Sequence, residues 1–166
     1  MDKNKLDIDT LYNTYSKNLY NTALRITKSN FYAEEAMHLT FITYINYKQK
    51  DQIENIALWL KKVCIRKSID FIRNKVKEEI FINEFIEEDR YNNNYPTDTQ
   101  IHLKVAKIKD AINLLPHKYR IVLSLILFEG YDYQEIEEIT KVNQGTIRSW
   151  YSRGKMHLLK LIETTE

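Results

Sequence analysis

Apolar residues recur at the three- and four-residue spacing of an α-helix along most of this 166-residue chain. Only three Gly and two Pro are present to interrupt helices. No segment shows the alternation of apolar and polar residues that is typical of a half-buried strand. We therefore expect an all-α fold.

The helical pattern begins near residue 10, where Asp9 or Thr10 is the expected cap of the first helix. Ala36, Met37 and Phe41 are expected on the core face of the second helix. The predicted helices are those over residues 10–26, 31–47, from about 56, 101–115, 117–128, 133–140 and 144–161.

Residues 78–100 have a different character. An acidic run is followed by three successive Asn and a Pro, without helical spacing. We therefore predict two small helical domains, over residues 1–77 and 101–166, joined by an acidic, Asn-rich linker over residues 78–100. Domains of this size bury only about 60% of their unfolded surface, so their helices need nearly complete apolar faces.

The net charge of +2 hides two separate basic segments. Residues 61–77 contain seven bases and one acid, and residues 141–160 contain five bases and no acid. Two basic surfaces in one chain indicate a polyanionic partner that is held at two places.

The second basic segment lies in a predicted helix-turn-helix. A short helix over residues 133–140, a three-residue turn and a longer helix have the arrangement that places a recognition helix in a DNA major groove. One side of the longer helix is apolar, and the other side is predicted to contact bases or phosphates. The predicted DNA-binding residues are Thr146, Arg148, Ser149, Ser152 and Arg153. A solvated amphipathic helix is the alternative, which the preceding helix and turn disfavour.

The first basic segment forms a stripe on the third predicted helix. Trp59, Lys62, Arg66, Ile69 and Arg73 lie within one sector of the helix, which Lys77 extends. Cations interleaved with an aromatic ring suit single-stranded or distorted nucleic acid. In the alternative interpretation, Trp59 belongs to the core and the lysines only keep the surface soluble.

These motifs resemble the sigma-70 family of bacterial RNA polymerase sigma factors, in particular its extracytoplasmic-function group. The C-terminal part resembles sigma region 4 through Leu-Pro before an Arg, a Gly-aromatic-x-x-x-Glu-Ile helix, and Gly-Thr-x-x-Ser ending in Arg. The matching residues are Leu115, Pro116, Arg120, Gly130, Tyr131, Glu135, Ile136, Gly145, Thr146, Ser149 and Arg153. The resemblance implies that this helix-turn-helix binds the minus-thirty-five promoter element.

The N-terminal part resembles sigma region 2. There the resemblance implies polymerase docking by Glu34, Glu35, His38 and Leu39, and minus-ten contacts by the stripe on the third helix. The chain departs from the family pattern in having His38 for Gln, Leu39 for an acid and Arg66 for Asn. In the helix-turn-helix, Glu137 replaces the usual Ala, and Lys141 replaces a common Gly. A carboxylate at position 137 is expected to widen the helix crossing or to extend outward.

The expected function is that of a transcription initiation factor that binds core RNA polymerase and promoter DNA, with an anti-sigma factor as a further candidate partner. We expect no enzymatic activity, cofactor or metal, because the four His are scattered, the single Cys64 cannot form an internal disulfide, and no Gly-rich phosphate loop is present. A cytoplasmic location and no membrane insertion are expected. One alternative is a stand-alone DNA-binding regulator, and another is a protein-binding module that uses the helix-turn-helix only for packing.

Overall fold

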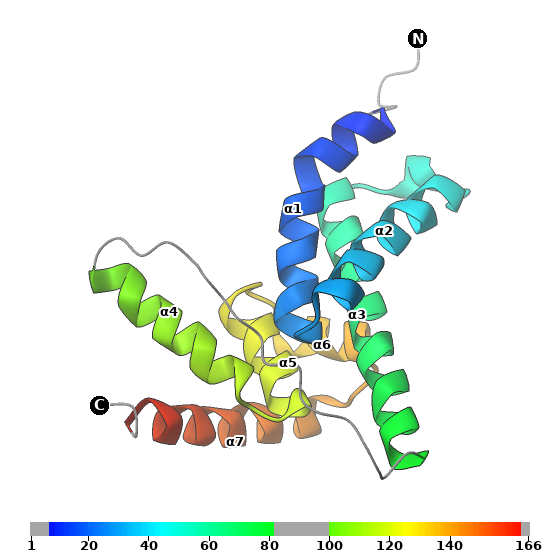
Figure 1. The fold of residues 1–166 in the computed structure, drawn as a ribbon. Helices are drawn as coiled ribbons and strands as arrows, with labels where there is room; N and C mark the ends of the chain where they lie inside the picture. Colours follow the sequence, from blue (N-terminus) through cyan, green and yellow to red (C-terminus); the bar gives the residue numbers. More distant parts are fainter. Residues whose placement is uncertain (1–6, 82–99, 164–166) are drawn as a thin grey trace. The chain divides into compact units, whose positions relative to one another are not determined.

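The computed structural model describes residues 7–81 and 100–163. These residues form α-helices and one short 3-10 helix, without a strand among them, which confirms the predicted all-α fold. The chain divides into two compact units, Met1–Asn83 and Glu84–Glu166 (Figure 1). The predicted boundaries at residues 77 and 101 stay predictions.

The first unit contains three long helices that pack against one another, α1 (Ile8–Thr27), α2 (Asn30–Asn46) and α3 (Ile56–Phe81), with a 3-10 helix at Lys50–Gln52 (Figure 1). Each helix contributes fully buried apolar side chains to one core. They include Leu11, Leu19, Ala23, Ala36, Leu60 and Cys64. Met37 and Phe41 are also buried, as the helical pattern predicts.

The predicted cap of α1 was wrong. The helix begins at Ile8 with Asp7 as its N-cap residue, and the Asp7 side chain makes no capping hydrogen bond. Asp9 lies in the first turn, where its carboxylate interacts favourably with the positive end of the helix dipole. Preference for a cap residue does not distinguish between neighbouring Asp and Thr residues, so the pattern fixed the helix but not its first residue.

Helix α3 extends to Phe81, so the first four residues of the predicted linker are helical. The rest of that linker, apart from Gln100 at the start of the next helix, lies outside the described residues. No helix in the described parts of the chain is long and apolar enough to cross a membrane.

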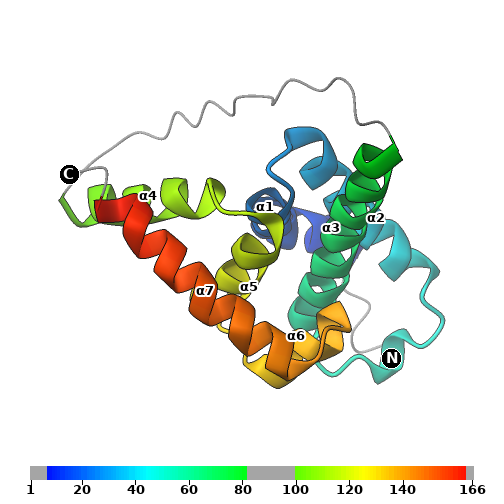
Figure 2. The same ribbon diagram turned by 90° about the horizontal axis from the view of Figure 1, so that it is seen from below.

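The second unit contains α4 (Gln100–Asn113), α5 (His117–Leu127), α6 (Tyr133–Thr140) and α7 (Gln144–Glu163). Helix α7 packs against α4, α5 and α6 (Figure 2). Helix α7 approaches α5 closely at Gly154, where an added Cβ would lie 3.1 Å from Tyr119 Cβ and 3.2 Å from Leu123 Cδ1. The small residue therefore lets α7 lie directly on α5.

Candidate nucleic-acid interface

Local hydrogen bonds define both ends of α6. Asp132 Oδ1 accepts from the Glu135 backbone N–H at 2.8 Å, and Glu135 Oε2 accepts from the Asp132 N–H at 3.0 Å, which completes a capping box. At the other end, Lys141 has the left-handed conformation (φ 62°), and its N–H donates to the Glu137 carbonyl. The helix therefore stops sharply before a three-residue turn.

The start of α7 is fixed by Asn143, whose side-chain oxygen accepts from the Thr146 N–H at 2.9 Å. Ile136, Ile139 and Ile147 are buried, and α6 packs against α7. The two helices and their turn match the predicted residue ranges, with α7 continuing two residues further. This geometry is that of a helix-turn-helix.

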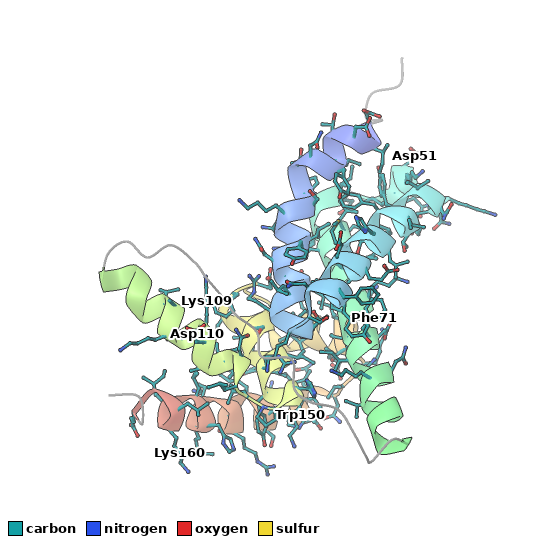
Figure 3. The ribbon with its side chains drawn as sticks, in the orientation of Figure 1. Asp51, Phe71, Lys109, Asp110, Trp150 and Lys160 are labelled. Carbon is teal, nitrogen blue, oxygen red and sulfur yellow. The ribbon has the colours of Figure 1, made fainter. Side chains whose placement is uncertain are left out.

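Burial along α7 matches the two predicted faces. Ile147, Gly154 and Leu158 are buried, and Tyr151 and Leu161 pack partly buried against the core. On the other face, Arg148, Ser152 and Arg153 are exposed, and Thr146 and Ser149 are half-buried. Figure 3 labels Trp150, which packs half-buried against the core, and Lys160, which is exposed near the end of α7. The predicted DNA-binding set thus lies together on one helix.

The stripe on α3 is mixed. Arg66 and Arg73 are exposed and Lys62 is half-buried, but Ile69, which the helical wheel put in the same sector, is buried. Arg73 also pairs with Asp70 at 3.8 Å. The stripe is therefore narrower than predicted, because its apolar member points to the core.

Trp59 lies at the N-terminal end of this stripe, between core and solvent. Its half-buried ring packs against the core of the first unit. The ring centroids of Tyr47 and Tyr44 lie 5.1 and 5.9 Å from its own. The core interpretation of Trp59 therefore holds for part of the ring, and the rest remains exposed beside two tyrosines.

The predicted polymerase-docking residues lie on α2. Glu34 is exposed, and Glu35, His38 and Leu39 are half-buried. His38 contacts α1, since Tyr12 Oη lies 3.4 Å from its Nε2 and the two rings are stacked. Large apolar side chains flank these residues on the outer side of the helix. Phe31, Ile42 and Ile45 are 69%, 50% and 52% exposed.

The second unit matches the family "Sigma-70, region 4" over residues 106–158, which include α6, the turn and most of α7. RNA polymerase sigma factor SigV of Bacillus subtilis is 31% identical over 119 residues, which cover 68% of this chain and 64% of SigV. The ECF RNA polymerase sigma factor SigM of the same organism is 26% identical over 158 residues, covering 94% of this chain and 95% of SigM. The chain belongs to the extracytoplasmic-function (ECF) group of the sigma-70 family.

This ECF sigma-family chain has a fold similar to that of a solved sigma factor. That protein is RpoE from Bartonella quintana, solved in complex with the anti-sigma factor NepR. The TM-score is 0.67 at 21% identity, and the match covers 96% of this chain and 99% of RpoE.

Arg120, one of the residues that resemble the family motif, is not on the surface of this ECF sigma-family chain. It is 2% exposed, and its guanidinium donates to the Leu115 carbonyl at 3.2 Å and lies 2.8 Å from His117 Nδ1. Burial lowers the pKa of Arg120 to about 10. Arg120 is a buried residue of the first turn of α5, and this position indicates a structural role.

Sequence reasoning missed two contacts of the helix-turn-helix. Gln144 Nε2 donates to Glu137 Oε2 at 2.9 Å, so the unusual carboxylate has a partner and remains half-buried. The guanidinium carbon of Arg148 lies over the Tyr133 ring, 5.3 Å from its centroid. Both contacts cross the turn, so no helical spacing within one segment could have revealed them. Within the described residues, no group of His, Cys, Asp and Glu could hold a metal ion.

Proposed function

We propose that this ECF sigma-family chain is a transcription initiation factor that binds core RNA polymerase and directs it to specific promoters. The observation that carries the proposal is the exposed basic face of α7, whose residues Arg148 and Arg153 lie inside the region 4 match. The proposed domains are region 2 over residues 1–77, a linker over residues 78–100 and region 4 over residues 101–166.

Region 4 is proposed to bind the minus-thirty-five element. Arg148 and Arg153 can each donate two hydrogen bonds to a guanine edge or to a phosphate, and both are exposed. Thr146, Ser149 and Ser152 lie on the same side of α7 and can donate to bases or phosphates. The pairing of Glu137 with Gln144 removes the main reason to regard this motif as a packing device alone.

Region 2 is proposed to have two separate surfaces. On α2, Glu34, Glu35, His38 and Leu39 would contact the polymerase. On α3, Trp59, Lys62, Arg66 and Arg73 would contact the minus-ten element. The combination of cations with a partly exposed indole supports contact with unpaired bases and their phosphates.

Promoter recognition, rather than catalysis, is the proposed activity, and nucleotide chemistry would belong to the polymerase. We propose a cytoplasmic location, where polymerase and promoter DNA meet. An anti-sigma factor is a further proposed partner, supported by the complex in which the similar RpoE was solved.

Run-off transcription with bacterial core polymerase on a promoter library tests this function. Transcripts that start at a shared promoter motif, and only when the chain is added, are the expected result. Binding to core polymerase is measured in parallel. Specific duplex binding without any affinity for core polymerase would contradict the proposal and favour the stand-alone regulator.

A further inference from the structure

Two tyrosines and two cations alternate at the junction of α6 and α7. Arg148 lies over the Tyr133 ring at 5.3 Å, the Tyr133 and Tyr151 rings meet edge to face at 6.2 Å, and Lys155 Nζ lies 4.9 Å from the Tyr151 centroid. Both cations are exposed, and both rings are half-buried. Each ring therefore has one of the two cations over its face.

Tyr133 is the first residue of α6 and lies between Asp132 and Glu135, the two residues of its capping box. The capping hydrogen bonds fix the backbone there, and the contact with Tyr151 limits the movement of the ring. Arg148 comes from the second turn of α7, the predicted DNA-contacting part. A ring held by one helix therefore holds a cation of the other.

Unlike a salt bridge, this contact leaves the N–H donors of the Arg148 guanidinium available for hydrogen bonds. All guanidinium N–H donors lie in the plane of the group, so a ring against its face does not use them. A carboxylate partner would occupy these donors. An Arg side chain loses considerable rotamer freedom when it is fixed on binding, and prior fixing reduces that cost.

We propose that Tyr133 is a positioning residue that holds the Arg148 guanidinium ready to contact promoter DNA. The inference rests on the proposed function and adds a determinant of affinity outside the predicted DNA-binding set. Attraction to a ring face at an exposed site corresponds to an effect of roughly two- to fivefold on affinity. The loss should depend on the ring and not on the phenol hydroxyl.

The first test uses the free full-length chain and NMR. Arg148 side-chain protons above a ring are expected to show an upfield ring-current shift. Tyr133→Leu should abolish the shift, and Tyr133→Phe should retain it. A wild-type Arg148 without such a shift would overturn the inference before any DNA is added.

The second test measures promoter affinity of the holoenzyme. Tyr133→Leu should weaken binding roughly two- to fivefold, Tyr133→Phe should restore it, and Tyr133→Leu should have no further effect when combined with Arg148→Ala. Arg153 is the matched control, because it is exposed on the same helix and no ring contact involves it among the described residues. Tyr133→Leu should retain its full effect in an Arg153→Ala background.

The outcomes separate the inference from the function on which it rests. Equal or tighter promoter binding by Tyr133→Leu, beside a promoter-selective wild type, would overturn the positioning role alone. Additive losses with Arg148→Ala would also overturn it, because they would indicate a general packing effect. A wild-type holoenzyme without any promoter preference would overturn the proposed function and the inference together.

Discussion

Gln144, the first residue of α7, donates a 2.9 Å hydrogen bond from its Nε2 to Oε2 of Glu137 on α6. Because Glu137 is half-buried, the bond satisfies a carboxylate that would otherwise be partly desolvated. It spans the turn and joins the two helices of the DNA-binding motif.

Glu137→Ala should therefore lower the free energy of unfolding by about 1 kcal/mol, although Ala is common here in the family. Glu137→Gln should cost less, because its amide oxygen can still accept from Gln144. Urea denaturation of both variants checks this. Combination with Gln144→Ala should give less than the sum of the single effects, and strict additivity would contradict the bond's contribution.

Gly154→Ala tests the close packing of α7 on α5. Ala is favoured over Gly within a helix by about 1 kcal/mol. The new Cβ would, however, lie 3.1 Å from Tyr119 Cβ, which the α5 backbone holds, and overpacking costs about 1 to 3 kcal/mol. We expect a net loss of about 1 kcal/mol by urea denaturation. Leu159→Ala, at an exposed site on the same helix, is the control and should change stability little.

Tyr131→Phe should stabilise the chain. The phenol hydroxyl is buried and has no hydrogen-bond partner among the described residues, so its removal should gain about 1 kcal/mol at neutral pH. Burial, with smaller contributions from Glu129 and Glu135, raises the pKa of Tyr131 from 10.0 to about 12. The folded chain therefore keeps a proton that the unfolded chain loses above pH 10.

The sign of the pH dependence follows from this difference. Below pH 10, Tyr131 is protonated in both the folded and the unfolded chain, and the wild type has its full stability. As the pH rises from 10 towards 12, only the unfolded chain loses the proton, so the wild type loses stability. The advantage of Tyr131→Phe should therefore grow above pH 10. Arg120, whose lowered pKa acts in the opposite direction, is present in both proteins and cancels in the comparison. An advantage that stays constant from pH 7 to 11 in urea denaturation would contradict this account.

The features predictable from the sequence were local ones. Both ends of α6 and the first residue of α7 were predicted correctly. The apolar period, Gly130 and the polar turn at 141–143 are strong short-range signals for these boundaries. The buried side of α7 followed from the same period. At α1 several polar residues in succession could all cap a helix, so its start was misplaced.

Features that depend on how helices pack were not predictable in the same way. Periodicity does not reveal that His38 meets Tyr12, 26 residues away, or that Arg120 is buried. It also put Ile69 beside cations that point to solvent. These outcomes depend on which neighbouring helix covers a given sector, which no single segment encodes.

Arg66→Ala should reduce the salt dependence of promoter binding by the holoenzyme. Each phosphate contact contributes about 0.7 to 0.9 log units of affinity per log unit of salt. Arg66 is exposed, whereas Arg73 already pairs with Asp70, so Arg66→Ala should flatten the slope more than Arg73→Ala. Lys17→Ala, at an exposed site on α1, is the control. Equal slopes for wild type and Arg66→Ala would make the α3 stripe an ordinary solvated surface.

Promoter recognition and polymerase binding should be lost separately in different variants. Arg148→Ala and Arg153→Ala should each weaken promoter binding by about 1 to 3 kcal/mol if the side chain contacts a base. Both should leave polymerase affinity intact, since these residues lie on the exposed face of α7 in the second unit. Lys118→Ala, an exposed site on α5, is the control. Affinity for core polymerase and run-off transcription are measured for each variant.

Charge reversal on α2 should have the opposite effect. Glu34→Lys with Glu35→Lys is preferable to a change at His38, because His38 contacts Tyr12 and its replacement would disturb the packing of α1 on α2. The double variant should lose polymerase binding with an unchanged circular dichroism spectrum, because Ala36, Met37 and Phe41 hold α2 in the core. Asn18→Lys, an exposed site on α1, controls for added positive charge. Full polymerase affinity in the double variant would remove α2 from the docking surface, even if the protein acts as an initiation factor.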